Sequence, residues 1–149
     1  HGRTLLTMTM TSKVKPYKLG FGPFAPEVYR MPFGDVVGPE KLKDFFIQYV
    51  NPEAVACVVA EPVQGEGGFI APPPGYFQEL AKICRDNGIL FVADEIQSGM
   101  GRTGALFSYM QKGVVPDILT SAKGLGGGIK LRVQLGGGEQ FRQSPVRVR

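Results

Sequence analysis

The sequence predicts an α/β fold of three layers with a mostly parallel sheet. Short runs of β-branched and other apolar residues alternate along the chain with segments of helical periodicity. A strand, a helix and a second strand follow one another within about 40 residues, which suits a βαβ unit. Parallel strands of this kind are buried on both faces, so we expect helices on both sides of the sheet.

Composition indicates an ordinary globular protein. The 149 residues suit one domain or a large part of one, with 43% hydrophobic and 20% charged residues. No apolar run approaches the ~18 residues of a membrane span, and the first residues show no secretory signal. Cys57 and Cys84 lie in apolar patterns without metal-type spacing, which favours free thiols in a reducing cytoplasm. We therefore expect a cytoplasmic protein with no membrane partner.

The net charge of +4 is unevenly distributed. Residues 129–149 hold five basic residues and one acidic residue, so residues 1–128 are neutral, with 12 of each. A nucleic-acid-binding domain usually carries a basic surface on its body. The body of this chain has no such excess, and we expect no nucleic-acid partner.

The N-terminal third contains one ambiguous segment and one clear helix. Residues 1–35 join the apolar alternation TLLTMTMT to a loop rich in Gly, Pro and aromatic residues, and the alternation fits a helix or a strand equally. Residues 39–50 predict a helix because Pro39 suits a first turn. Its apolar residues also recur at helical spacing: Leu42, Phe45, Phe46 and Tyr49.

The remaining body alternates strands with a helix. Residues 54–63 and 89–95 are short, β-branched and apolar, and both predict buried strands. Between them, residues 75–88 place apolar side chains on one helical face and end in Asn-Gly, a common helix stop. Residues 116–128 predict a third short strand that runs into a glycine-rich loop.

Acidic residues end two of these strands. Glu61 and Asp94 each finish an apolar run, and Gln64 and Gln97 follow three residues later. Ligands of open α/β sheets bind beyond the carboxyl ends of the strands, so this edge is the expected site. Asp94 could instead cap a helix or form a salt bridge. With His1 as the single histidine, an organic cation suits Asp94 better than a metal does.

Lys123 is the second informative residue. It lies in TSAKGLGGG, at the end of the third predicted strand and before four glycines in five positions. A partly desolvated amine in such a place is nucleophilic, whereas the alternative is a lysine that binds phosphate beside a flexible loop. The Walker motif does not apply, because there the glycines precede the lysine. A lysine amine and a strand-end aspartate together suggest pyridoxal phosphate.

The chain resembles the class III (fold type I) pyridoxal-phosphate-dependent aminotransferases, and among them the bacterial 4-aminobutyrate aminotransferases. The resemblance is carried by HGRTLLTMTMTSKVKPYKLGFGPFAPEVYR, EPVQGEGGF, ADEIQSGMGRTG and PDILTSAKGLGGG. These stretches are spread over residues 1–128, which the resemblance identifies as the central part of the cofactor-binding large domain. The spacing of ADEIQSG, GRTG and a downstream AK is highly specific for this class.

The resemblance implies roles for four residues around the cofactor, pyridoxal 5'-phosphate. Lys123 binds it covalently and moves the proton during catalysis. Asp94 pairs with the pyridine nitrogen, Gln97 approaches the 3-hydroxyl oxygen, and Ile96 packs on one face of the ring.

It also implies two substrate-binding residues. Arg3 matches the arginine that binds the distal carboxylate of 4-aminobutyrate through its bidentate fork. Glu61 matches the glutamate that pairs with a second arginine, which lies downstream in the family and is not in this sequence.

The implied reaction transfers the amino group of 4-aminobutyrate to 2-oxoglutarate, giving succinate semialdehyde and glutamate. Ornithine, acetylornithine or β-alanine are alternative donors. The family implies a homodimer or a dimer of dimers. Two readings from other classes stay open: a non-catalytic phosphate-binding α/β module that uses the glycines at 124–128, and a structural relic with no ligand.

The resemblance stops after residue 128. Residues 129–149 are basic and glycine-rich without clear periodicity, and we expect an anomalous tail that is disordered or results from a reading-frame change. Because the chain starts at His1 and lacks other parts of the family, we expect an internal fragment that is inactive alone.

Overall fold

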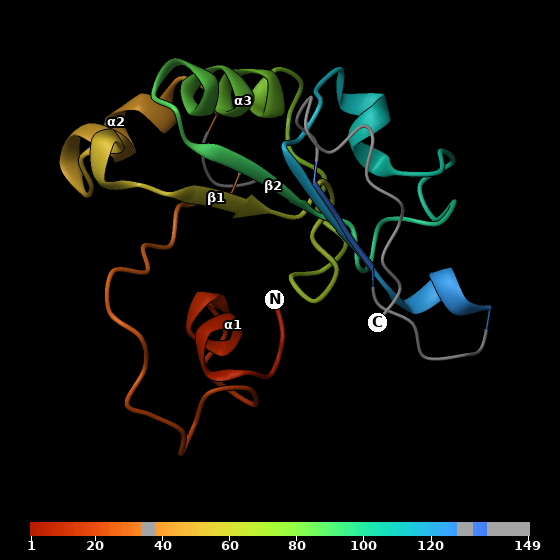
Figure 1. Cartoon of the computed structure of the whole chain (residues 1–149), viewed down its shortest axis with the longest axis horizontal. Coiled ribbons are helices and arrows are strands. Elements are labelled where there is room, and N and C mark those ends of the chain that lie inside the picture. Colours follow the sequence, from red (N-terminus) through yellow and green to blue (C-terminus); the bar gives the residue numbers. More distant parts are fainter. Residues whose placement is uncertain (34–37, 128–132, 137–149) are drawn as a thin grey trace. The chain divides into compact units, whose positions relative to one another are not determined.

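The computed structural model describes residues 1–33, 38–127 and 133–136. The chain forms two compact units, His1–Pro32 and Phe33–Arg149 (Figure 1). None of the helices in the described ranges is both long and apolar enough to cross a membrane.

The first unit contains one helix, α1 (Leu5–Met10), so the ambiguous apolar alternation is helical. Its threonines are compatible with a helix because their hydroxyls donate to carbonyls one turn earlier. Thr9 Oγ1, for example, donates to the carbonyl oxygen of Leu5 at 2.7 Å. The loop that follows is attached to the end of α1, where Lys18 Nζ donates to the carbonyl oxygen of Thr11 at 3.0 Å.

The second unit contains a four-stranded sheet of order β1-β2-β3-β4. Strands β1 (Cys57–Ala60), β2 (Leu90–Asp94) and β3 (Ile118–Ser121) are parallel, as the βαβ pattern predicts. Strand β4 (Val133–Gly136) is antiparallel to β3, and the sequence analysis did not predict it. The sheet is therefore mostly parallel, in agreement with the predicted fold class.

The expected anomalous tail at 129–149 lies mainly outside the described residues. Within that range, the structure describes only β4, which pairs along the whole of β3. Strand pairing of this kind is made by backbone groups, so it needs no regular side-chain pattern in the added strand.

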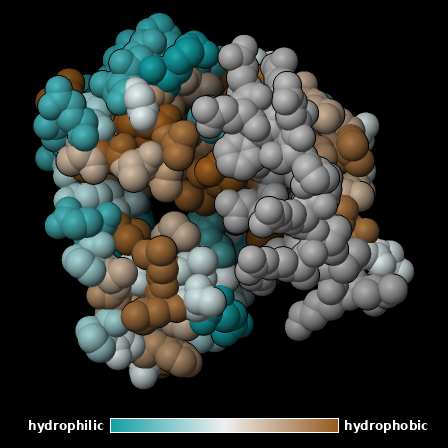
Figure 2. All heavy atoms as spheres, in the orientation of Figure 1, coloured by the Kyte–Doolittle hydropathy of each residue, from teal (hydrophilic) through white to brown (hydrophobic). Residues whose placement is uncertain are grey.

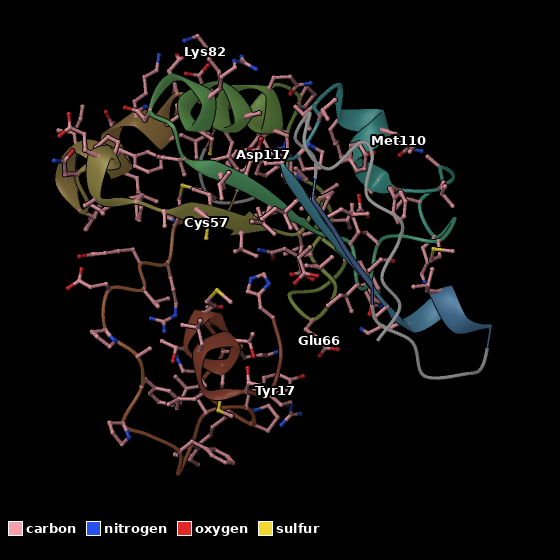
Figure 3. The ribbon with its side chains drawn as sticks, viewed as in Figure 1. Tyr17, Cys57, Glu66, Lys82, Met110 and Asp117 are labelled. Atoms are coloured by element: carbon pink, nitrogen blue, oxygen red, sulfur yellow. The ribbon has the colours of Figure 1, made fainter. Side chains whose placement is uncertain are left out.

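In the described part of the second unit, helices cover one face of the sheet, whereas the sequence analysis expected helices on both faces. Helix α3 (Tyr76–Asp86) packs on β2, and α2 (Lys41–Gln48) packs against α3. The buried face of α3 consists of Tyr76, Phe77, Leu80, Ile83 and Cys84, as its periodicity predicts. Figure 2 shows hydrophilic residues over the outer side of this helix, where Figure 3 labels Lys82.

Strand β2 is the centre of the hydrophobic core. All of its residues after Leu90 are buried, which explains its continuous apolar sequence. The ring of Phe91 lies 5.8 Å from that of Phe77 on α3, measured between centroids. Asp117, labelled in Figure 3, fixes the entrance to β3 because its Oδ2 accepts from the backbone N–H of Phe91 at 2.8 Å. This contact joins the start of β3 to β2, next to the pairing of Val92 with Ile118.

The two cysteines differ sharply in environment, which gives a first prediction. Cys84 is 1% exposed, and burial raises the pKa of its thiol to about 12, with a further contribution from the charge of Asp117. Because the thiolate is the reactive form, we expect Cys84 to react with iodoacetamide at pH 8 at least ~100-fold more slowly than the exposed Cys57. Peptide mass spectrometry measures both rates.

Denaturant supplies the control for this measurement. In the unfolded chain the two thiols should react at similar rates, because the burial that disfavours the Cys84 thiolate is lost. Equal rates in the folded protein would contradict the packing of α3 on β2.

Candidate active site

Three parallel strands end at the same edge of the sheet. Ala60 of β1 pairs with Ala93 of β2, and Asp94 of β2 pairs with Thr120 of β3. Glu61 directly follows Ala60, so it leaves β1 at the level where Asp94 ends β2. The loops after all three strands therefore start beside one another, where ligands of open α/β sheets bind.

Asp94 is a buried carboxylate held by the neighbouring strand and by its own loop. It is 6% exposed. Its Oδ1 accepts from Thr120 Oγ1 at 3.3 Å and from the backbone N–H of Ile96 at 3.2 Å. The residues that follow form a turn, so the alternative that Asp94 caps a helix is wrong. Two donors on one oxygen fix the orientation of this carboxylate.

Lys123 begins the short 3-10 helix η3 (Lys123–Gly126), immediately beyond the end of β3. Its φ of 49° lies in the left-handed region, which non-glycine residues seldom adopt outside special sites. Its Nζ donates to Gln97 Oε1. The residue is exposed, whereas the sequence analysis expected partial desolvation, because η3 has already left the sheet. The amine is therefore accessible to an incoming reagent.

A glycine brings the first two loops together. A Cβ on Gly65 would lie 2.5 Å from Cγ of Gln97, so these residues are in close contact. The backbone N–H of Gly65 also donates to Glu61 Oε1 at 3.2 Å. Glu61, Gln97 and Lys123 thus belong to one connected group of residues that spans the three loops.

This contact predicts the effect of Gly65→Ala. The added methyl must displace Gln97, because a Cβ–Cγ distance of 2.5 Å is far inside van der Waals contact. Since the hydrogen bond with Gln97 holds the Lys123 amine in one position, its loss lets the amine approach an electrophile more freely, and we expect acetylation of Lys123 to become roughly 3- to 10-fold faster. Mass spectrometry of acetylated peptides measures the rate.

Gly67→Ala is the matched control, because it changes the same loop. A Cβ at Gly67 would meet the flexible end of Gln64, which can rotate away. The acetylation rate of Lys123 in the Gly67→Ala variant should equal that in the unmodified protein. If both variants behave alike, the effect is not specific to Gln97.

The structure places the other predicted residues with less detail. Ile96 is half-buried in the turn after β2. Arg3 belongs to the first unit, where its guanidinium lies over the ring of Tyr17, 4.8 Å from the centroid. Ring packing by Ile96 and carboxylate binding by Arg3 stay predictions.

Sequence reasoning missed Thr120 and Glu95. The Thr120 hydroxyl contacts Asp94 because the two residues are register partners, which cannot be read from one strand. Glu95 is 0% exposed, and its signal was a second acidic residue directly after a buried strand.

The described residues contain no cluster of three or more His, Cys, Asp or Glu side chains that could hold a metal. A cavity of about 730 Å³ lies between α2 and the end of α3, and Phe46, Asn51, Lys82 and Ile83 contribute to its lining. It is lined by none of the predicted site residues, so it is separate from the strand ends.

Comparison of sequences identifies the relatives of this chain. The family model for aminotransferase class-III matches residues 1–145. A probable 4-aminobutyrate aminotransferase of Bacillus subtilis is 52% identical over 155 aligned residues, covering 95% of this chain and 36% of the relative. An ornithine aminotransferase of the same organism is 45% identical over 129 residues, covering 87% and 30%.

The solved structures that are similar to this chain are also those of aminotransferases. An ornithine aminotransferase of Toxoplasma gondii, with pyridoxal phosphate at partial occupancy in its active site, superposes with a TM-score of 0.78 at 33% identity, over 95% of this chain and 31% of that one. An (S)-enantioselective ω-transaminase of Thermomicrobium roseum gives 0.78 at 33% identity, over 92% and 33%. These neighbours confirm the fold type I expectation. The chain spans about a third of the length of its curated relatives, and it belongs to the aminotransferase class-III family.

Proposed function

We propose that the whole protein is a pyridoxal-phosphate-dependent transaminase that transfers the amino group of 4-aminobutyrate to 2-oxoglutarate. The observation that carries the proposal is the connected edge at which the Lys123 amine contacts Gln97 while Asp94 ends the adjacent strand. Family membership supports the class of reaction. The products are succinate semialdehyde and glutamate.

The residues at this edge fit the cofactor. Pyridoxal phosphate has an aldehyde that an amine binds covalently and a pyridine nitrogen that a carboxylate keeps protonated. Lys123 offers an exposed amine, and Asp94 offers a carboxylate whose orientation two hydrogen bonds already fix. Gln97 contacts the amine and lies on the turn that directly follows Asp94.

When bound, the cofactor supplies an electron sink that stabilises the negative charge left on the substrate carbon after deprotonation. The protein supplies the proton transfers and the orientation. Lys123 Nζ would be the general base that accepts the proton from the amino-bearing carbon and then the general acid that passes this proton on, so that the amino group leaves the donor. Asp94 keeps a proton on the pyridine nitrogen, and Gln97 Oε1 orients the resting amine.

The choice of 4-aminobutyrate rests on the names of relatives and on Arg3. A probable 4-aminobutyrate aminotransferase of Bacillus subtilis is 52% identical to this chain, and the 4-aminobutyrate aminotransferases of Mycobacterium leprae and Escherichia coli are 42% and 44% identical. An ornithine and an acetylornithine aminotransferase are similar at 45% and 44%. A guanidinium binds any suitably placed carboxylate, so another ω-amino acid is the second candidate donor.

A donor panel tests the proposal on the whole protein. With 2-oxoglutarate as acceptor, kcat/KM should be highest for 4-aminobutyrate among a panel that also holds ornithine, acetylornithine and β-alanine. Omission of the acceptor is the control, since it must stop turnover after one equivalent. A preference for ornithine would replace the donor and keep the reaction class, whereas failure to take up the cofactor would overturn the class.

Assembly and completeness belong to the same proposal. The amino donor and the 2-oxo acid are the small-molecule partners, and the whole protein forms a homodimer or a dimer of dimers, which light scattering measures. The isolated chain spans only about a third of its relatives and should show no turnover. Measurable turnover by the isolated chain would contradict this last point.

A further inference from the structure

Glu95 has no role in the site as described so far, although its burial is complete. It follows Asp94 directly and is 0% exposed. Burying a carboxylate is costly unless its oxygens are hydrogen-bonded, so the structure must compensate for this residue. The hydrogen bonds that compensate for this burial indicate the role of Glu95.

Both carboxylate oxygens of Glu95 are used. Oε2 accepts from Ser98 Oγ at 2.6 Å, and Oε1 accepts from the backbone N–H of Tyr109 at 2.7 Å. In the described part of the chain these partners are a hydroxyl and a backbone amide rather than a cation. Ser98 lies on the turn after β2, and Tyr109 lies on the 3-10 helix η2 (Ser108–Lys112). One side chain thus connects that turn to a separate segment.

The backbone of Glu95 holds the same turn at both ends. Its N–H donates to the carbonyl oxygen of Thr120 on β3 at 2.9 Å, and its carbonyl oxygen accepts from the N–H of Gly99 at 2.9 Å. A Cβ on Gly99 would lie 2.7 Å from that carbonyl oxygen and 3.1 Å from the ring of Phe107. Only glycine fits there without displacement of the backbone, so residues 95–99 form a tightly closed turn.

Gln97 lies in the middle of this turn. Its position is therefore determined by contacts that Glu95 makes on both sides, while its Oε1 accepts from Lys123 Nζ. Asp94 and Glu95 divide two tasks, because successive residues leaving a strand point to opposite sides. Asp94 contacts Thr120 at the strand-end edge, and Glu95 contacts the interior and η2.

We propose that Glu95 is a positioning residue, whose buried carboxylate holds the 95–99 turn so that Gln97 reaches the amine of Lys123. The proposal rests on the proposed function only for the statement that this amine reacts with the cofactor. The contact itself belongs to the protein without cofactor and can be measured there.

The test uses the whole protein stripped of cofactor and four variants. Glu95→Ala removes both side-chain contacts, and Glu95→Gln keeps an acceptor for the Tyr109 N–H. Ser98→Ala removes one contact and leaves the carboxylate, so it gives a result even if Glu95→Ala does not fold. Glu79→Gln on α3 is the matched control, because it alters a carboxylate that pairs with Lys43 at 3.1 Å away from the turn.

The readout is the rate of acetylation of Lys123 across pH, with thermal unfolding measured alongside. We expect Glu95→Ala to accelerate Lys123 acetylation roughly 3- to 10-fold, because the amine loses its fixed acceptor. Ser98→Ala and Glu95→Gln should give smaller accelerations, and Glu79→Gln should give none. After cofactor is added back, the absorbance spectrum of Glu95→Ala should also differ from that of the unmodified protein.

The opposite result is equally clear. If Glu95→Ala and Ser98→Ala lower the unfolding temperature but leave the Lys123 rate and its pH profile unchanged, Glu95 is structural only and the proposal is wrong. If the unmodified protein takes up no cofactor, the proposed function fails instead. The acetylation rates still decide the role of Glu95 in that case.

Discussion

Replacement of Lys123 by alanine should abolish covalent binding of pyridoxal phosphate by the whole protein and reduce transamination on the order of 10²–10⁴-fold or more. The amine is exposed just beyond the end of β3 and contacts Gln97, and it is the group that we propose as nucleophile and proton carrier. The left-handed φ of 49° is set by the backbone around η3, and alanine faces the same strain there as lysine. The fold should therefore be retained.

Borohydride reduction of the cofactor-loaded protein, followed by peptide mapping, is the direct measurement. The pyridoxyl group should be found on Lys123 and should disappear in Lys123→Ala. Lys82→Ala is the control, since Lys82 lies on the outer side of α3 (Figure 3) and pairs there with Asp86. A pyridoxyl group on any other lysine would overturn the assignment.

Asp94→Asn should lower kcat on the order of 10²–10³-fold, which is a typical loss when one preorganised electrostatic group is removed from a catalytic site. The change removes the charge that would keep the pyridine nitrogen protonated. It preserves the shape of the side chain, and the remaining oxygen can still accept from Thr120 Oγ1 and from the Ile96 N–H. The loss should therefore appear in kcat and in the cofactor absorbance, with little change in thermal unfolding.

Asp86→Asn provides the comparison for this variant. Asp86 is an exposed carboxylate on α3 whose pKa is lowered by its hydrogen bond from Lys82. Its replacement should leave kcat unaltered, because it lies on a helix away from the strand ends. Retention of full turnover by Asp94→Asn would contradict the assignment of Asp94 to the cofactor site.

Local sequence was sufficient to predict most elements of the second unit. The helix expected at 75–88 is observed as α3, and the strand expected at 89–95 is observed as β2. Periodicity works here because each segment has a fixed buried side, and the spacing of its apolar residues records that side. The apolar alternation at α1 did not distinguish a helix from a strand. Its threonines fit either element, and in the structure their hydroxyls donate to backbone carbonyls one helical turn earlier.

The candidate site also has a part that the sequence predicted and a part that it did not. That Glu61 and Asp94 would leave a parallel sheet at one edge, with Lys123 at the end of the third predicted strand, followed from the βαβ pattern and from the general position of ligands in such sheets. The contact between Gly65 and Gln97, and the burial of Glu95, did not follow. Each of these features involves contacts between segments that are distant in sequence. How close those segments come depends on the register of the strands that precede them.

The sequence by itself thus determined the fold class, the edge of the sheet at which the candidate site was predicted and the residue types available there. Only the tertiary structure decided that Gln97 accepts a hydrogen bond from Lys123 and that Thr120 donates one to Asp94. It also decided that β4 pairs with β3 in the antiparallel direction. The physical reason is that periodicity and composition report how one segment meets its surroundings. Contacts between segments are set by hydrogen-bond register and close packing, which exist only once the strands have paired.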